Sequence, residues 1–426
     1  MAKVLPFSGV IYNPEKFNNL DGLVVPSYNL ISSSLRKKLM EDLNNFSHLV
    51  FPFGSEQEKY KNVVNRFFGW LLRDILVIDK SPSYYAVQIE TKENGISKKC
   101  VGFYGLLKIE DQFSLNFPET VDESLVMDKY NLLKESQAIF EPVCFMYRDQ
   151  SKFIESKIEE AIKALVPLFE VNAFKNSYRV YKIKDEQLTK DIREYFEKAN
   201  LYVAGGQSIL SASLKYREEM KNIRGEKFSG QEPFNFVFSV FFNYFNETVQ
   251  LVPVQRGIKK IDLSVNDIMK SIAANYKFGV IQFNDAREEV LAKRKLKIFI
   301  EENRKKNILS FGFYHRSFPS RYFIFTYKTP VNEFDINVLN KSILDVLRIN
   351  PLDNSVVEYV YNYDELFEMV KNGEFTAGFI VDGVNKSRIF ELSERKISLP
   401  PLSFSFYPLL ISGILLYSFR YSVYTQ

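Results

Sequence analysis

The sequence has few of the side chains that bind metal ions or form disulfide bonds. It contains only two cysteines, Cys100 and Cys144, and two histidines, His48 and His315. The cysteines have neither a metal-binding spacing nor a disulfide framework, and two histidines cannot build a histidine-rich metal site. Few cysteines and no signal peptide indicate a cytoplasmic protein, and no metal site is expected.

The chain also lacks a strong excess of charge of either sign. Its formal net charge is +4, from 56 basic and 52 acidic residues, so the basic surface of a nucleic-acid binder is not expected. Hydrophobic residues make up 46% of the chain and charged residues 25%, which is typical of a globular protein. The 39 phenylalanines and 25 tyrosines are spread along the chain, which favours a role in the core.

Residues 397–419 contain no charged side chain and resemble a membrane span at first sight. A span requires about 20 apolar residues in an unbroken helix. Leu402, Phe404 and Phe406 instead alternate with the period of a strand. The run is broken by a glycine and three prolines, namely Gly413, Pro400, Pro401 and Pro408. The pattern therefore favours a buried strand, and membrane binding is not expected.

The remaining patterns alternate between strands and helices, which predicts a mixed α/β (α+β) fold. Residues 84–90 and 101–109 alternate as a hairpin around Asn94-Gly95, and residues 60–78 have an amphipathic helical pattern. Residues 152–169 are also expected to be helical. We predict a core module over residues 1–256 and a second α/β module over residues 257–426, whose last strands pack back on the core.

The most informative stretch is residues 201–220, LYVAGGQSILSASLKYREEM. It predicts a short apolar strand, a turn at Gly205-Gly206 and an amphipathic helix. This geometry can hold phosphate, because a helix start presents unpaired N–H groups and glycine lets an anion approach the backbone. Gln207 and Ser208 would add polar side chains. The alternative is a turn that only connects a strand to a helix.

This stretch resembles the signature LY-I-ADGHHR-x-x-x-AL-x-YR-x-E of DUF1015, a large prokaryotic family of unknown function. The D-G-H-H-R turn is in turn similar to that of the ParB-like nucleotide-using proteins, which include the free-serine kinases. The resemblance implies a ParB-like core followed by a second α/β module. The residues that fit the signature are Leu201, Tyr202, Ala204, Gly206, Leu214, Tyr216, Arg217 and Glu219.

The residues that carry the chemistry of the family motifs are largely replaced in this chain. Asn29 stands where the family has an aspartate, and Gly205 replaces the aspartate of the turn. Asparagine keeps the hydrogen-bonding geometry but cannot act as a base. In the family's L-P-T-H-R motif the arginine is kept as Arg256. The other replaced positions are Gln207, Ser208, Ile209, Gln255, Leu402 and Leu409.

Two acids remain near family motifs. Glu119 either replaces the glutamate of the P-H-E-x-T element, shifted by one position, or is an ordinary surface residue, and we favour the surface position. Asp128 begins a D-K-x-x-L-L match to the family's D-R-x-x-L-L helix.

The resemblance with these losses implies a catalytically depleted paralogue that binds a ligand or serves as a structural subunit, with no assigned catalytic residue. Its ligand would be a nucleotide or phosphate, and its partner an intact family member or a second copy of itself. The alternative is a nucleotide-dependent small-molecule kinase or nucleotidase with a relocated active site. Phosphoryl transfer needs positioned carboxylates and cations, and these are the groups that are lost.

Overall fold

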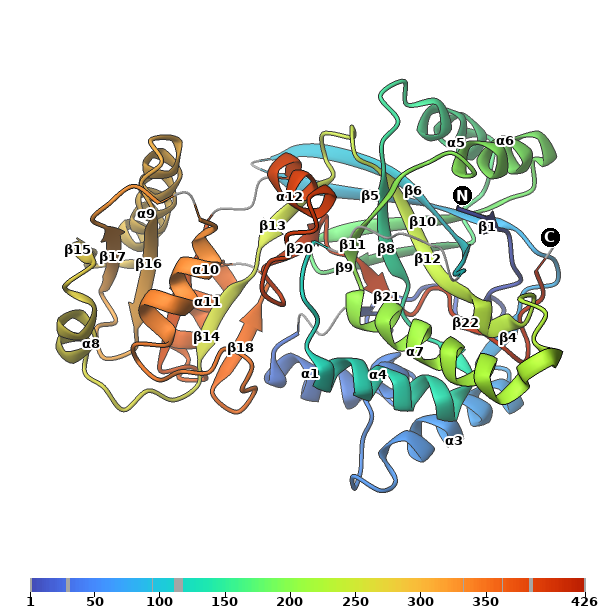
Figure 1. Cartoon of the computed structure of the whole chain (residues 1–426), viewed down its shortest axis with the longest axis horizontal. Coiled ribbons are helices and arrows are strands. Elements are labelled where there is room, and N and C mark those ends of the chain that lie inside the picture. Colours follow the sequence, from blue (N-terminus) through green and yellow to red (C-terminus); the bar gives the residue numbers. More distant parts are fainter. Residues whose placement is uncertain are drawn as a thin grey trace.

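The computed structural model describes residues 2–27, 31–93, 95–110, 118–331, 333–361, 363–382 and 386–424. Within these ranges the chain has the predicted mixed α+β fold, with two large sheets side by side (Figure 1). Asn29 and Asn94 lie outside the described residues.

The larger sheet has eight strands in the order β11-β8-β12-β6-β5-β10-β9, with β1 also paired to β6. Its neighbouring strands are antiparallel, apart from the parallel pair β8 and β12. The central strand β12 is buried along its whole length, because its residues FVFSVFFN are almost all apolar. The strands are β1 (Val4–Leu5), β5 (Tyr84–Glu93), β6 (Ile96–Lys108), β8 (Val143–Tyr147), β9 (Phe169–Ala173), β10 (Asn176–Ile183), β11 (Leu201–Gly205) and β12 (Phe236–Asn243).

Helices lie on both sides of this sheet (Figure 1). On one side are α5 (Phe153–Lys163) and α6 (Glu186–Phe196). On the other are α3 (Lys59–Leu72), α4 (Glu123–Ser136) and α7 (Gln207–Arg224), and the short helices α1 (Ser33–Met40) and α2 (Ser47–Val50) lie nearby. Ser32 caps α1, since its side chain accepts the Leu35 N–H, as a serine cap should.

The smaller sheet has six strands in the order β15-β17-β16-β19-β14-β18. The side chains of its strands point alternately to two buried faces of the sheet. Helices α9 and α11 pack on one face, and α8 and α10 contribute to the hydrophobic core on the other. The strands are β14 (Gln255–Ile258), β15 (Tyr276–Gln282), β16 (Ser310–His315), β17 (Arg321–Tyr327), β18 (Val357–Val360) and β19 (Ala377–Ile380). The helices are α8 (Val265–Ile272), α9 (Ala286–Lys305), α10 (Asp335–Leu339) and α11 (Tyr363–Lys371).

After α12 (Lys386–Glu394), the C-terminal segment forms short strands that pair with earlier parts of the chain. Its alternating pattern predicted such strands. None of the helices in the described ranges combines the length and apolar character needed to cross a bilayer. The two-stranded pairs are β20 (Phe404–Tyr407) with β13 (Gln250–Pro253), β21 (Ile411–Ser412) with β3 (Val25–Pro26), β22 (Tyr417–Ser418) with β7 (Ala138–Ile139), and β2 (Val10–Tyr12) with β4 (Leu76–Ile78).

The predicted division between residues 256 and 257 stays a prediction. It falls inside β14, whose four residues all pair with β18 of the six-stranded sheet. The preceding strand β13 pairs instead with C-terminal β20.

Two predicted helices end earlier than expected. The helix expected over residues 60–78 ends at Leu72, and residues 76–78 form β4. The helix expected over residues 152–169 ends at Lys163, and the hairpin β9–β10 follows it. The hairpin turn uses Phe174 and Lys175 with φ of 51° and 65°, so it has none of the glycine or asparagine that normally marks such a turn.

Replacing Phe406 by alanine should test the C-terminal strand. Phe406 is 1% exposed and its ring centroid lies 4.7 Å from that of Phe242 in the central strand. The substitution should lower the free energy of unfolding by about 3–5 kcal/mol, measured by denaturant unfolding, because it removes a buried aromatic ring. Ile397→Ala is the control, since Ile397 is 51% exposed. Equal effects of the two changes would contradict the placement of Phe406 in the core.

Candidate functional site

The Gly205-Gly206 turn has the geometry that the sequence predicted. Gly205 ends β11, and Gly206 has a left-handed backbone (φ 78°) immediately before α7. Among the described residues, no side chain forms a capping hydrogen bond at the start of this helix. A left-handed residue at this position favours glycine, which explains why Gly206 is suited to joining the strand to the helix.

Glu119 lies next to this turn, and the expectation that it is an ordinary surface residue is wrong. Its side chain is buried, with 5% of the residue exposed. Its Oε1 atom accepts the N–H groups of Ser403 at 2.7 Å and Phe404 at 3.0 Å. The Gln207 side-chain amide donates to its Oε2 atom at 3.2 Å. Glu119 therefore joins the start of α7 to the C-terminal segment.

The backbone that binds Glu119 is shaped by Leu402, which has a left-handed conformation with φ of 55°. Successive N–H groups after such a residue can point at the same anion, an arrangement called a nest. The N–H groups of Ser403 and Phe404 converge in this way on one carboxyl oxygen. The chain thus fills this nest with its own side chain.

Arg256 is buried close to the same segment. Residue Arg256 is 1% exposed, and its guanidinium lies 4.9 Å from the centroid of the Tyr359 ring. Its Nη2 donates to the Leu402 carbonyl oxygen at 2.9 Å, and its Nη1 donates to the Val254 carbonyl oxygen. Its Nε has no hydrogen-bond partner among the described residues. The guanidinium is therefore held mainly by backbone carbonyls and an aromatic ring.

Burial changes the titration of both groups. It raises the pKa of Glu119 to about 8, against the opposing effects of the Phe404 and Ser403 N–H groups and of Arg256. Burial lowers the pKa of Arg256 to about 10, although Tyr359 and Glu119 oppose this. Burial therefore favours the protonated form of Glu119, while Arg256 keeps its positive charge at neutral pH.

The other candidate residues are partly brought together. Gln207 meets Glu119, and Ser208 lies half-buried one residue further along α7. Asp128 lies apart: its carboxylate accepts the Tyr60 hydroxyl at 2.8 Å and is 3.6 Å from Lys59 Nζ. It borders a cavity of about 430 Å³ that also includes Leu402 and Tyr359 in its wall.

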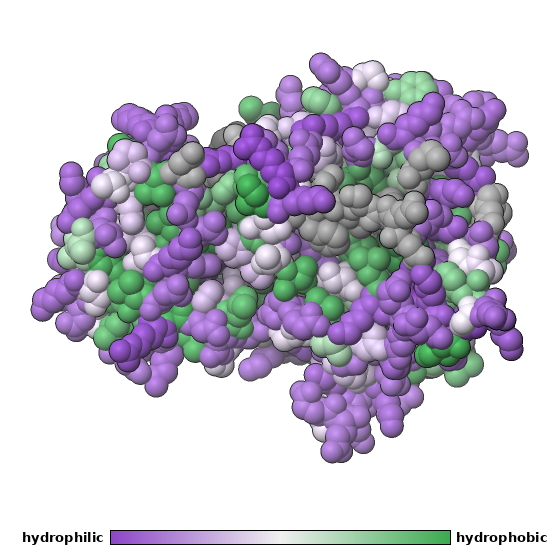
Figure 2. Space-filling model, in the orientation of Figure 1, coloured by the Kyte–Doolittle hydropathy of each residue, from purple (hydrophilic) through white to green (hydrophobic). Residues whose placement is uncertain are grey.

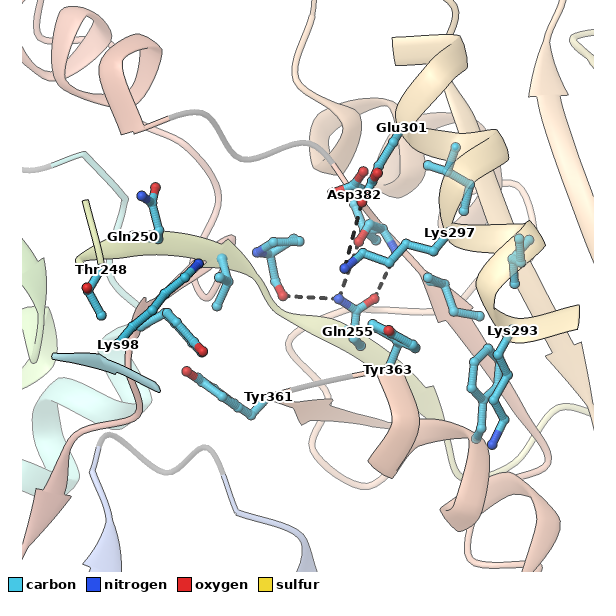
Figure 3. A pocket seen from close by; sticks show the side chains of 18 of the residues that line it. Lys98, Thr248, Gln250, Gln255, Lys293, Lys297, Glu301, Tyr361, Tyr363 and Asp382 are labelled. Carbon is cyan, nitrogen blue, oxygen red and sulfur yellow. Dashed lines mark hydrogen bonds and ion pairs between the residues drawn. The ribbon is translucent and has the colours of Figure 1, made fainter. Parts of the chain in front are cut away.

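A larger cavity, of about 480 Å³, lies between the two sheets and was not anticipated from the sequence (Figure 3). We call it the α9 cavity, because Lys293, Lys297 and Glu301 of α9 form one wall. Gln255 lines the α9 cavity. Its neighbour Arg256 does not line the cavity and donates instead to the Leu402 carbonyl oxygen. The Gln255 amide is fully engaged, since it accepts the Val381 N–H at 2.8 Å and donates to the Pro253 and Val381 carbonyl oxygens.

Aromatic side chains and charges of both signs line the α9 cavity. Lys297 lies 3.7 Å from Glu301, and Asp382 lies 4.0 Å from Arg304, so both pairs are loose. The Asp382 Oδ2 atom is buried without a hydrogen-bond partner among the described residues. The aromatic residues are Tyr361, Tyr363, Phe367 and Tyr407. Helical spacing of Lys293, Lys297 and Glu301 was the only sequence signal for this wall.

A family model for a protein of unknown function, DUF1015, matches residues 4–347 of the chain. The chain belongs to the DUF1015 family. No curated protein matches this DUF1015 member. Among its described residues, no group of three or more histidine, cysteine, aspartate or glutamate side chains is placed to hold a metal ion.

Three solved structures are similar to this DUF1015 protein. A conserved hypothetical protein from Pyrococcus furiosus is 14% identical, with 74% of this chain and 96% of that chain covered and a TM-score of 0.38. A free serine kinase in complex with AMP is 13% identical, with 71% and 86% covered and a TM-score of 0.36. SbnI from Staphylococcus aureus, truncated at its C-terminus, is 7% identical, with 73% and 86% covered and a TM-score of 0.35. We draw no functional conclusion from likenesses this distant.

The buried carboxyl of Glu119 should make the free energy of unfolding depend on pH. The pKa of Glu119 is raised from 4.5 to about 8 on folding, so the folded protein binds this proton more strongly than the unfolded chain does. The resulting stability is fully present below pH 4.5 and is lost as the pH rises through about 8. Glu119→Gln cannot titrate, so the free energy of unfolding of the unmodified protein should fall relative to that of the variant over this range.

Urea unfolding at a series of pH values would measure this difference. Glu123→Gln is the matched control, because the Glu123 side chain is 73% exposed. A difference between wild type and Glu119→Gln that does not change with pH would show that the carboxyl titrates normally.

Proposed function

We propose that this DUF1015 protein is a catalytically depleted member with a ParB-like core, which acts as a ligand-binding or structural subunit. The observation that carries the proposal is the environment of Glu119. An acid that serves as a base or holds Mg²⁺ must be ionised and must face the reacting group. The Glu119 carboxyl is instead buried, which raises its pKa, and it is bound by the backbone N–H groups of Ser403 and Phe404.

The surviving cation is also engaged by the chain. Arg256 would have to face a transferring phosphoryl group to stabilise its charge. Its terminal nitrogens donate to the carbonyl oxygens of Val254 and Leu402, and its face lies over Tyr359. Leu402 replaces a family lysine at this same place, so the local positive charge is further reduced. These contacts support a structural role for both retained groups.

The α9 cavity is the better place for a ligand than the Gly205-Gly206 turn. A phosphate at the turn would lie beside the Glu119 carboxyl, which already accepts a hydrogen bond from Gln207. The α9 cavity offers tyrosine rings against which a base can pack and the Lys297 ammonium, which is 48% exposed, for a phosphate. Its volume of about 480 Å³ lies in the range of small-molecule sites. We therefore propose a nucleotide as its ligand.

A nucleotide-dependent kinase or nucleotidase with a relocated site is the second candidate. It is favoured by Asp128, whose carboxylate is partly exposed and borders the cavity that includes Leu402 and Tyr359. In that case Asp128, supported by Lys59, would have to position the acceptor or a metal ion.

An activity assay separates the two candidates. With ATP or ADP, Mg²⁺ and small hydroxylated acceptors, followed by phosphorus NMR, we expect no turnover above that of a buffer control. Turnover that is lost in Asp128→Asn and kept in Glu123→Gln would overturn the proposal and identify the relocated acid. Turnover lost in Glu119→Gln would instead place the reaction at the buried carboxyl.

Ligand binding is tested separately by thermal unfolding. ATP, ADP or AMP should raise the melting temperature in a saturable way. At one hundred times its dissociation constant, the nucleotide should increase the free energy of unfolding by about 2.7 kcal/mol. Lys297→Met should remove most of this effect, because it removes the phosphate partner from the α9 cavity. Gln207→Glu is the comparison, since it adds negative charge at the turn. If Gln207→Glu abolishes binding and Lys297→Met leaves it unchanged, the ligand binds at the turn.

A further inference from the structure

Strand β15 forms an open edge of the six-stranded sheet. It pairs with β17 in an unbroken register from Tyr276 with Tyr327 to Gln282 with Arg321. On its other side β15 has no strand partner among the described residues. Its backbone makes hydrogen bonds to β17 alone within the described ranges. A row of N–H and C=O groups therefore faces outward along seven residues.

Proteins usually protect such an edge, and another edge of this molecule is partly protected. On β9, the edge strand of the larger sheet, the Asn172 N–H donates to the Asp21 carboxylate at 2.6 Å. β15 has no proline and no bulge, and its single charged residue is Lys277. Val280 on β15 is 48% exposed. Long apolar edge strands of this kind pair readily with another strand.

The sequence of β15, YKFGVIQ, is suited to pairing with itself. In an antiparallel pair centred on Gly279, all seven residues find a partner. Phe278 would lie opposite Val280, and Lys277 opposite Ile281, so apolar side chains meet and the two lysines are kept apart. Cross-strand pairs of apolar side chains stabilise a sheet, whereas like charges directly opposite each other destabilise it.

The symmetry of such a pairing closes the assembly. An antiparallel pair of identical strands has a twofold axis at its centre, so each copy uses the same surface and no edge of β15 is left. Val280 is exposed on this edge, and an exposed apolar group at such a place favours burial by a second copy.

We propose that two copies of this protein associate through β15, antiparallel and centred on Gly279, which joins the two six-stranded sheets into one continuous sheet. This goes beyond the proposed ligand-binding role and does not depend on it. The partner is a second copy of the chain, recognised by main-chain hydrogen bonds along the edge and by the pairing of Phe278 with Val280.

A single introduced cysteine tests both the association and its register. Residue 279 is the one position that meets itself in this pairing, and paired strands bring such residues within the reach of a disulfide. A Cβ added at Gly279 would meet Ile324 at an ordinary contact distance of 3.6 Å. Both native cysteines are buried, so Gly279→Cys should form a covalent dimer on mild oxidation. Lys277→Cys is the control and should remain largely uncrosslinked, since it faces Ile281.

Light scattering on the full chain completes the test. The unmodified protein should have twice the mass of one chain, and Val280→Lys should shift it to the monomer mass while circular dichroism shows an intact fold. Leu291→Lys adds the same charge on α9 and should leave the dimer. A monomeric unmodified protein, a dimer that Leu291→Lys rather than Val280→Lys dissociates, or crosslinking in Lys277→Cys but not in Gly279→Cys would each overturn the proposal.

Discussion

The binding of the Glu119 carboxyl by the backbone of Ser403 and Phe404 is the interaction around which the candidate site is organised. It brings together segments that are distant in the sequence: the strand bridge of Glu119 with Leu399, the start of α7 through Gln207, and the C-terminal segment. The left-handed backbone at Leu402 turns the following N–H groups toward Glu119 and leaves the Leu402 carbonyl for Arg256. One backbone turn therefore donates hydrogen bonds to a buried acid and accepts one from a buried cation.

Under the proposed function, this arrangement would let the site lose its chemistry and keep its architecture. A helix start, a backbone nest and an arginine are features that attract an external anion in other proteins. Here the nest binds an internal carboxyl, and the arginine donates to backbone carbonyls. Burial of a polar group is tolerated when its hydrogen bonds are satisfied, which holds for the Glu119 oxygens. The backbone around the family motifs is thus stabilised by the protein's own side chains, Glu119 and Arg256.

Much of the fold followed from local patterns, whereas the site depended on distant contacts. Glycine and apolar periodicity gave the β11 turn and α7, and alternation gave β20, because these signals lie within a few residues. Glu119 was assigned to the surface because the groups that bury it lie more than 280 residues away, at Ser403 and Phe404. The β9–β10 hairpin was missed because its turn is Phe174-Lys175.

The α9 cavity illustrates the same limit. Lys297 and Glu301 are one helical turn apart, a spacing that in most proteins marks a solvated helix face. Only the packing of α9 on β15, β16 and β17 places that face beside Gln255 and Asp382. No local pattern contains this information, since the walls come from separate parts of the chain.

The pairing of the last strands with the first has a consequence for synthesis on the ribosome. The hydroxyl groups of Ser27 and Ser412 are hydrogen-bonded across 385 residues, next to the pair β3–β21. Because a chain emerges from its N-terminus, β3 and β7 leave the ribosome long before β21 and β22 exist. The apolar groups that the C-terminal strands finally cover remain exposed until residues 404–418 have been synthesised. Until then, β3 and β7 lack the strands with which they pair in the folded protein.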